Sequence, residues 1–270
     1  MSTLIECRGL TKRYGRTQAL AGVDLSLERG APIALVGPNG AGKTTLFSML
    51  CGFVRPSSGD VRVLGEPAGA AVLRGRIGAL PQDASLAPGF PVRSQLVQLA
   101  RLQGFARPAA RAEADRVLER VRLVEAAGNV PESLSHGMRK RISFAQALIG
   151  SPELLLLDEP TAGVDPPNVR VIHALIRELG DEVDFLISSH NLDELERLTE
   201  RVVTLEGGRV SARGELADER RGGAGTDGEA APGRLTSRWV RYARRNPPPT
   251  CCGRWNRSAS AGSPNAVTCC

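Results

Sequence analysis

The segment Gly37-Pro38-Asn39-Gly40-Ala41-Gly42-Lys43-Thr44-Thr45 decides the fold of this chain. It follows the apolar run Ile33 to Gly37, precedes a helix-like run, and matches the pattern GxxxxGK(S/T). Glycines in this pattern let backbone N–H groups close on phosphates at a helix N-terminus. The lysine then reaches the β- and γ-phosphates, and the Thr44 hydroxyl is placed to ligate Mg²⁺. The segment predicts a phosphate-binding loop; a glycine-rich turn with a chance lysine fits the strand and helix context poorly.

Two acids end the apolar run Leu154-Leu155-Leu156-Leu157-Asp158-Glu159. Taken alone, a buried strand ending in a solvated acidic turn would be the better interpretation. A nucleoside triphosphate site, however, needs a carboxylate opposite its phosphate loop. We therefore expect Asp158 to hold Mg²⁺ through its water shell and Glu159 to be the general base that polarises the attacking water.

Short apolar runs alternate with longer amphipathic stretches, which is typical of an α/β domain with a largely parallel sheet. Residues 92–127 have helical spacing and predict a helical insert between two halves of that sheet. The runs that read as buried strands are Ile33 to Gly37, Leu154 to Asp158, Asp184 to Ser189, and Arg201 to Leu205, the last followed by a Gly207-Gly208 turn and Arg209 to Ser211. The runs that alternate like antiparallel strands are Leu4 to Leu10, Val23 to Leu27 and Asp60 to Gly65.

A series of motifs, in order and over about residues 3–214, resembles the nucleotide-binding domains of the ATP-binding-cassette (ABC) family. The resemblance implies a P-loop NTPase (RecA-like) fold, with a mixed sheet core, an antiparallel β subdomain and an inserted helical subdomain. We place this domain at residues 1–216, with the insert at about 83–150. The segments that carry the resemblance are Tyr14, 37–45, Gln82, Leu134-Ser135-His136-Gly137-Met138, 154–159, Ala162-Gly163-Val164-Asp165 and His190.

Three single residues take roles only through this resemblance. It assigns Tyr14 to stacking on adenine, Gln82 to contacting the metal and the attacking water, and His190 to hydrogen bonding the γ-phosphate. Without the resemblance, the aromatic and the histidine would more often be structural, and a loop glutamine would indicate nothing.

The segment 134–138 resembles the family's signature, in which Ser135 and Gly137 cap the γ-phosphate of ATP bound by the opposite subunit. Such capping implies a head-to-tail dimer, and Asp165 resembles the aspartate that couples its two sites. The commonest signature is LSGGQ, whereas this chain reads LSHGM, with His136 and Met138 as the departures. Similar variants with SxGM occur in drug, antibiotic and polysaccharide exporters, so the resemblance favours export.

Composition and charge limit the function classes. Of the 270 residues, 41% are hydrophobic. The sequence has no apolar run of membrane-spanning length and no secretory signal. The 250 residues before the first Cys-Cys pair hold only two cysteines, which indicates a reducing compartment. We expect a cytoplasmic protein attached peripherally to the membrane through its permease. Seven arginines and no acids follow residue 230; since the net charge is +6, residues 1–230 carry about −1, and nucleic-acid binding is not indicated for the body.

The basic, low-complexity stretch 217–270 is expected to be a disordered tail, without packed structure beyond Gly222. Its paired cysteines lack the spacing of a zinc site, and its arginines with Trp and Tyr leave nucleic-acid or membrane binding open.

The resulting hypothesis is an ATP-hydrolysing subunit that uses ATP and Mg²⁺, pairs with a second nucleotide-binding subunit and drives export through separate transmembrane subunits. The alternatives are a soluble ABC ATPase of translation, repair or chromosome structure, and a regulatory nucleotide binder without hydrolysis. The compact stretch between Gln82 and Leu134 argues against the first, and Glu159 with His190 against the second.

Overall fold

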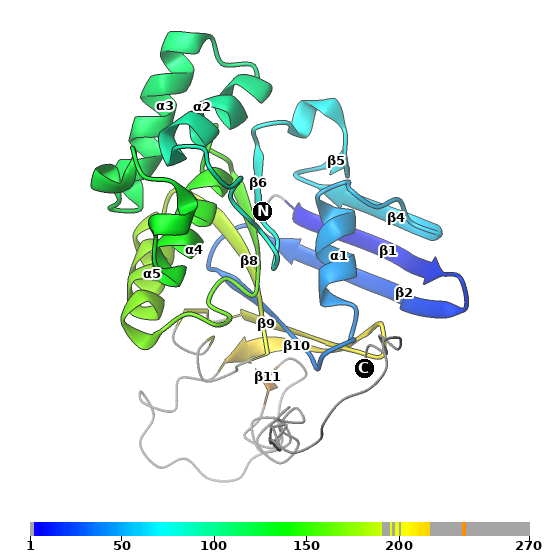
Figure 1. Cartoon of the computed structure of the whole chain (residues 1–270). Coiled ribbons are helices and arrows are strands. Elements are labelled where there is room, and N and C mark those ends of the chain that lie inside the picture. The colour runs from blue at the N-terminus through cyan, green and yellow to red at the C-terminus, as the bar shows by residue number, and fades with distance from the viewer. Residues whose placement is uncertain (1–2, 191–194, 196–197, 200, 217–233, 236–270) are drawn as a thin grey trace, which may run out of the picture.

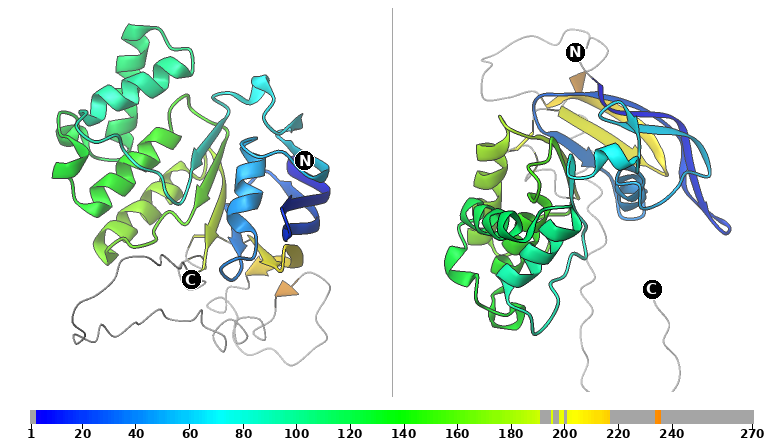
Figure 2. Two further views of the ribbon diagram at one scale, coloured as in Figure 1. Left: turned by 45° about the vertical axis from the view of Figure 1, so that its right-hand side comes forward. Right: turned by 90° about the horizontal axis from the view of Figure 1, so that it is seen from above.

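The computed structural model describes residues 3–190, 195, 198–199, 201–216 and 234–235. A seven-stranded sheet lies at the centre, with a smaller antiparallel sheet on one side and a group of helices on the other (Figures 1 and 2). Among the described residues, no helix combines the length and apolar character needed to cross a bilayer.

The central sheet has the order β11-β10-β9-β3-β8-β7-β6. Its strands from β9 to β6 run parallel, β10 pairs antiparallel with β9, and the short β11 lies at the edge, parallel to β10. The strands are β3 (Ile33–Val36), β6 (Ile77–Leu80), β7 (Leu154–Asp158), β8 (Asp184–Ser189), β9 (Arg201–Glu206), β10 (Arg209–Leu216) and β11 (Arg234–Leu235). Because β3 and β7 are buried along their whole length, they read as continuous apolar runs rather than alternating ones.

The second sheet has the order β2-β1-β4-β5, and each of its pairings is antiparallel. Helix α1 (Lys43–Leu50) lies between the two sheets, and its Leu46 and Leu50 belong to one buried cluster with residues of both. This packing fixes the N-terminus of α1 at the end of β3. The strands are β1 (Thr3–Tyr14), β2 (Thr17–Glu28), β4 (Ser58–Val63) and β5 (Glu66–Pro67).

The helical side begins with the predicted insert. In α2 the buried positions Val92, Leu96 and Ala100 recur every four residues, which gives one apolar face. The helices are α2 (Val92–Leu102), α3 (Arg107–Arg120), α4 (His136–Ala147) and α5 (Pro166–Leu179), with short 3₁₀ turns η1 (Ala71–Leu73), η2 (Val124–Ala126) and η3 (Pro131–Ser133).

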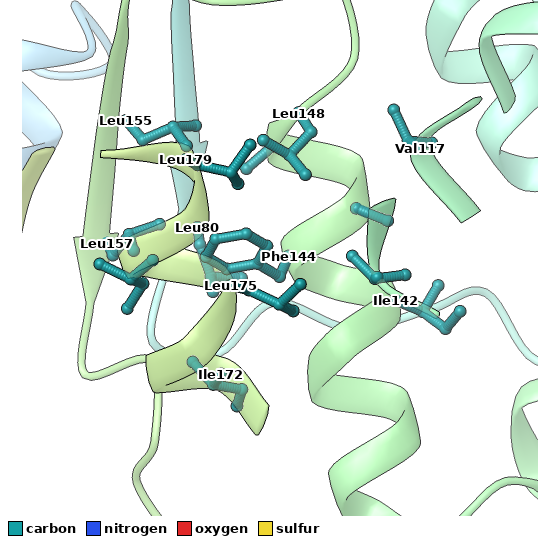
Figure 3. Close-up of a cluster of buried hydrophobic side chains, with 14 of the residues drawn as sticks. Leu80, Val117, Ile142, Phe144, Leu148, Leu155, Leu157, Ile172, Leu175 and Leu179 are labelled. Carbon is teal, nitrogen blue, oxygen red and sulfur yellow. The ribbon is translucent and has the colours of Figure 1, made fainter. Parts of the chain in front are cut away.

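Helices α4 and α5 are fixed to the sheet by a large apolar cluster. Figure 3 shows Phe144 of α4 between Leu175 of α5 and Leu80 and Leu157 of the sheet. Burial of each such side chain contributes roughly 1.5–3 kcal/mol, so the cluster holds the two helices firmly. It thereby also fixes their N-termini, which carry Ser135 and Asp165.

The expected architecture is confirmed: a mixed sheet core, an antiparallel sheet and an inserted group of helices. Strands β5 and β6 were not predicted. Arg234–Leu235 pair with β10, which departs from the expectation of no regular structure after Gly222. The rest of the predicted tail lies outside the described residues.

Candidate active site

The loop 37–45 connects β3 to α1 and is closely surrounded. A Cβ at Gly37 would lie 2.2 Å from the carbonyl oxygen of Leu205, and one at Gly42 would lie 2.5 Å from that of Ala19. Gly42 also has a φ of 103°, in the left-handed region that favours glycine. The two glycines of the motif are therefore required by the backbone as well as by any ligand.

The start of α1 has the chemistry of an anion site. Gly42 is the N-cap, and because it has no side chain it cannot accept hydrogen bonds from the first turn. The N–H groups of Lys43, Thr44 and Thr45 therefore remain donors at the positive end of the helix. Pro38, Asn39 and Gly40 form the exposed rim of the same loop, and Ala41 is buried. This donor set fits the phosphates of a nucleotide.

The buried Lys43 side chain points into this loop. Its Nζ donates to the carbonyl oxygens of Gly37 (2.8 Å) and Pro38 (3.3 Å) and lies 3.9 Å from Oε1 of Glu159. The ammonium is thus held by weak neutral acceptors and one carboxylate, and a phosphate oxygen is a stronger partner for it than a carbonyl.

Ser188, at the end of β8, organises both acids. Its Oγ donates to Oδ1 of Asp158 and accepts from the N–H of Glu159 at 3.0 Å. The three residues are almost fully buried, and Asp158 pairs with Ser188 across β7 and β8. Glu159 has a φ of 51°, a costly backbone conformation for a residue with a side chain. This conformation turns the chain directly after Asp158, the carboxylate predicted to bind Mg²⁺.

His190 contacts the predicted base. Its Nδ1 lies 2.7 Å from Oε2 of Glu159. Since an ionised carboxylate only accepts, Nδ1 carries the proton in this contact, and a neutral imidazole then presents Nε2 as an acceptor. His190 can therefore donate to a phosphate only as imidazolium or after leaving Glu159.

Of the three residues expected to contact Mg²⁺, Thr44 and Asp158 line one small cavity of about 40 Å³, whereas Gln82 lines a different cavity. Ser48 lines the same small cavity, and hydroxyl and carboxylate oxygens such as those of Thr44, Ser48 and Asp158 are the type of ligand that Mg²⁺ prefers. Cys51 also lines it; burial, with Asp158 adding to it, raises the pKa of this thiol to about 12, and Mg²⁺ prefers oxygen ligands to sulfur. The residues present fit the ion.

Gln82 lies two residues beyond β6, on the wall of a larger cavity of about 480 Å³ between its loop and α4. The backbone oxygen of Gln82 accepts a 3.2 Å hydrogen bond from Nζ of Lys140. Lys140 is only 8% exposed, and burial lowers its pKa. The negative charges of Asp83, Asp158 and Glu159, in that order of size, counteract that effect. A buried cation thus connects α4 to the Gln82 loop.

The signature segment lies at the N-terminus of α4. Ser135 is the N-cap, and its Oγ accepts from the N–H of Met138 at 3.2 Å, which leaves the hydroxyl proton free to donate. A Cβ on Gly163 would lie 3.6 Å from Nε2 of His136, so the histidine faces the segment 162–165 of its own chain. Asp165 caps α5 in turn.

Tyr14 is the last residue of β1 and is 48% exposed. The Nζ of Lys12 lies 5.1 Å from the centre of its ring, a cation–π contact that occupies one face. Stacking on adenine would use the other face and stays a prediction.

Several site residues were missed from the sequence. Ser188 is one, and the signal for it was a hydroxyl at the end of a buried strand beside the acidic one. Lys140 carried no signal, since it reads as a solvated helix charge. Gly208 was read as a turn only, but its N–H donates to the carbonyl of Ala41 at 3.1 Å and its own carbonyl accepts from Ala21 at 2.8 Å. It braces the phosphate loop against β2.

Comparison with known proteins decides the family. The model of the family described as ABC transporter matches residues 20–162, more than half of the chain. This chain belongs to the ABC transporter family. Among its ABC relatives, the Nod factor export ATP-binding protein I of Burkholderia orbicola is 38% identical over 213 residues, which cover 78% of this chain and 70% of that protein. The daunorubicin resistance ATP-binding protein DrrA3 of Streptomyces coeruleorubidus is 39% identical over 228 residues, 83% of this chain and 72% of that protein.

Solved ABC structures agree with the fold. The cassette cbiO1 of Clostridium perfringens, described as part of the ABC transporter complex cbiONQ, superposes with a TM-score of 0.70 at 29% identity, over 80% of this chain and 89% of that one. The dimeric cassette MJ0796 bound to ADP and Pi gives 0.71 at 23% identity, over 79% of this chain and 99% of that one, which supports the fold alone. The predictions of the family, of the P-loop NTPase fold and of an ATP-hydrolysing enzyme are confirmed.

Proposed function

We propose that this ABC subunit hydrolyses Mg²⁺-bound ATP in a dimer and drives export through separate transmembrane permease subunits, at the cytoplasmic face of a membrane. The observation that carries the proposal is the identity of 38–39%, across about four fifths of the chain, to ATP-binding proteins named for Nod factor export and daunorubicin resistance.

In this proposal the phosphate loop binds the nucleotide, Asp158 helps to hold the metal ion, and Glu159 accepts the proton of the attacking water. The N–H groups at the start of α1 bind the phosphates, and Lys43 exchanges the Gly37 carbonyl for a phosphate oxygen. Thr44 and Asp158 would hold Mg²⁺, with Gln82 as a further predicted contact; when bound, the ion neutralises phosphate charge. Because Lys43 moves toward the phosphate, its attraction for Glu159 weakens, and that carboxylate becomes free to accept a proton from water.

His190 orients the base in this scheme. Its Nδ1–H holds Oε2 of Glu159, so Oε1 is the oxygen left to accept the proton of the attacking water. The signature of a second subunit would complete the site. In that subunit, the free proton of Ser135 and the N-terminus of α4 favour an anion.

A soluble ABC ATPase without a permease is the competing function. To separate the two, the full chain is purified by affinity from detergent-solubilised native membranes and from the soluble fraction. Export predicts a membrane-spanning protein in fixed ratio to this chain. Recovery from the soluble fraction alone, with no such partner, supports the competing function.

A further inference from the structure

One side chain, Asn168, touches both the signature segment and Asp165 within the same chain. A Cβ built on Gly137 would lie 2.3 Å from Cγ and Nδ2 of Asn168, and 2.7 Å from its Cβ. The amide therefore lies directly against the backbone of Gly137. The same Nδ2 donates to Oδ1 of Asp165 at 2.9 Å and to Oδ2 at 3.1 Å.

The two segments that Asn168 joins lie at the N-termini of two helices. Ser135 caps α4, and Asp165 caps α5 by accepting from the N–H of Asn168 at 3.4 Å. The hydrogen bond from Asn168 is the main cause that lowers the pKa of Asp165, so the carboxylate stays ionised. The imidazole of His136, facing Gly163, adds a second contact between the same segments.

We propose that Asn168 is a positioning residue that makes the signature segment and Asp165 of one subunit move as a unit. The inference rests on the proposed ATP-bound dimer. When Ser135 and Gly137 shift to cap a nucleotide held by the partner subunit, the amide packed on Gly137 shifts with them and carries the Asp165 carboxylate. Gly137 is then required by Asn168 in its own chain, as well as by any phosphate.

A double-mutant cycle on the nucleotide-free protein tests the contact. Gly137→Ala introduces a methyl group into the space of Asn168 and should lower the thermal midpoint. Asn168→Gly removes all three atoms that this methyl meets, so adding Gly137→Ala to it should have a much smaller effect. Additive effects of the two substitutions would overturn the contact.

A second experiment tests the positioning role. Asn168→Asp keeps the shape against Gly137 but replaces the donor by an acceptor beside Asp165. In the full-length Glu159→Gln protein it should weaken ATP-driven dimerisation by about tenfold, because hydrogen bonds to a carboxylate are lost. In the otherwise wild-type protein it should lower the Hill coefficient for ATP while leaving the ATP affinity of the monomer unchanged. Arg170→Gln, exposed on the same helix, makes the same change in charge and is the matched control.

The outcomes separate the two levels of the proposal. A Glu159→Gln protein that stays monomeric with Mg²⁺ and ATP refutes the proposed function, and this inference with it. Dimerisation that occurs and is equal in Asn168→Asp and in the control refutes the inference alone.

Discussion

Ser188→Ala should damage the active site without unfolding the protein. Ser188 is completely buried, and its hydroxyl donates to Asp158 while accepting from the N–H of Glu159. A hydrogen bond to a charged group contributes about 1.5–3 kcal/mol. Losing the hydrogen bond from the N–H of Glu159 costs less, because this N–H also donates to the backbone oxygen of Ser188 at 3.2 Å and retains that acceptor in the variant. We take the loss to be about 2 kcal/mol of the interaction that orients the Asp158 carboxylate, which is predicted to bind Mg²⁺. This corresponds to roughly a 30-fold change in an equilibrium or rate constant.

The assay is steady-state ATP hydrolysis over a range of Mg²⁺ concentrations. We expect kcat/KM to fall about 30-fold and the Mg²⁺ concentration for half-maximal rate to rise, because Asp158 is no longer oriented. Thr199→Val is the control, since it removes another buried hydroxyl, one that donates to the carbonyl of Leu195. Hydrolysis within twofold of wild type in Ser188→Ala, at unchanged Mg²⁺ dependence, would refute the reasoning.

Three further predictions concern other parts of the chain. Lys140→Met keeps the side-chain length but removes the donor to the Gln82 carbonyl. Hydrolysis should therefore fall about tenfold, while the thermal midpoint stays almost unchanged. A fall in hydrolysis accompanied by a clear fall in the thermal midpoint would mean that Lys140 has a purely structural role. His136→Gly should change the ATP-driven dimer affinity of the Glu159→Gln protein by well under ~1 kcal/mol between pH 6 and 8, because the imidazole faces Gly163 of the same chain. Dimers that are tighter at pH 6 with His136 present, but not in His136→Gly, would show a direct contact with the phosphate. Removal of residues 222–270 should leave hydrolysis within about twofold, since each predicted site residue lies upstream, and a truncated protein that fails to fold would show that the boundary is wrong.

The sequence predicts the fold best where burial is uniform. β7 and β8 begin and end at the predicted residues: β7 reads as four consecutive leucines because it is covered on both faces, and β8 has the buried apolar centre Phe185-Leu186-Ile187. β6 was missed because it contains Gly78, which ordinarily weakens a strand. There a Cβ would lie 2.0 Å from the carbonyl oxygen of Ala147, so the glycine lets α4 approach the sheet.

The candidate site is predictable only where a motif is continuous along the chain. The phosphate loop and the acids are continuous segments, whereas the contacts that hold them join residues far apart. Ser188 meets Asp158 only because β8 pairs with β7, and Asn168 meets Gly137 only because α4 packs beside α5. Ser188 carried only the weak signal of a hydroxyl at the end of a buried strand, and Asn168 carried none, because the roles of both residues arise from tertiary packing.

The central claim is that Glu159 is the base of an ATP site completed by a second subunit. The most direct test is size-exclusion chromatography of the Glu159→Gln protein with Mg²⁺ and ATP, together with its rate of hydrolysis. Gln keeps the shape of Glu159 but cannot accept the proton, so hydrolysis should fall about 10²- to 10⁴-fold. With ATP no longer consumed, the protein should elute as a dimer with ATP and as a monomer without it. Hydrolysis at the wild-type rate, or a protein that stays monomeric with Mg²⁺ and ATP, would contradict the account.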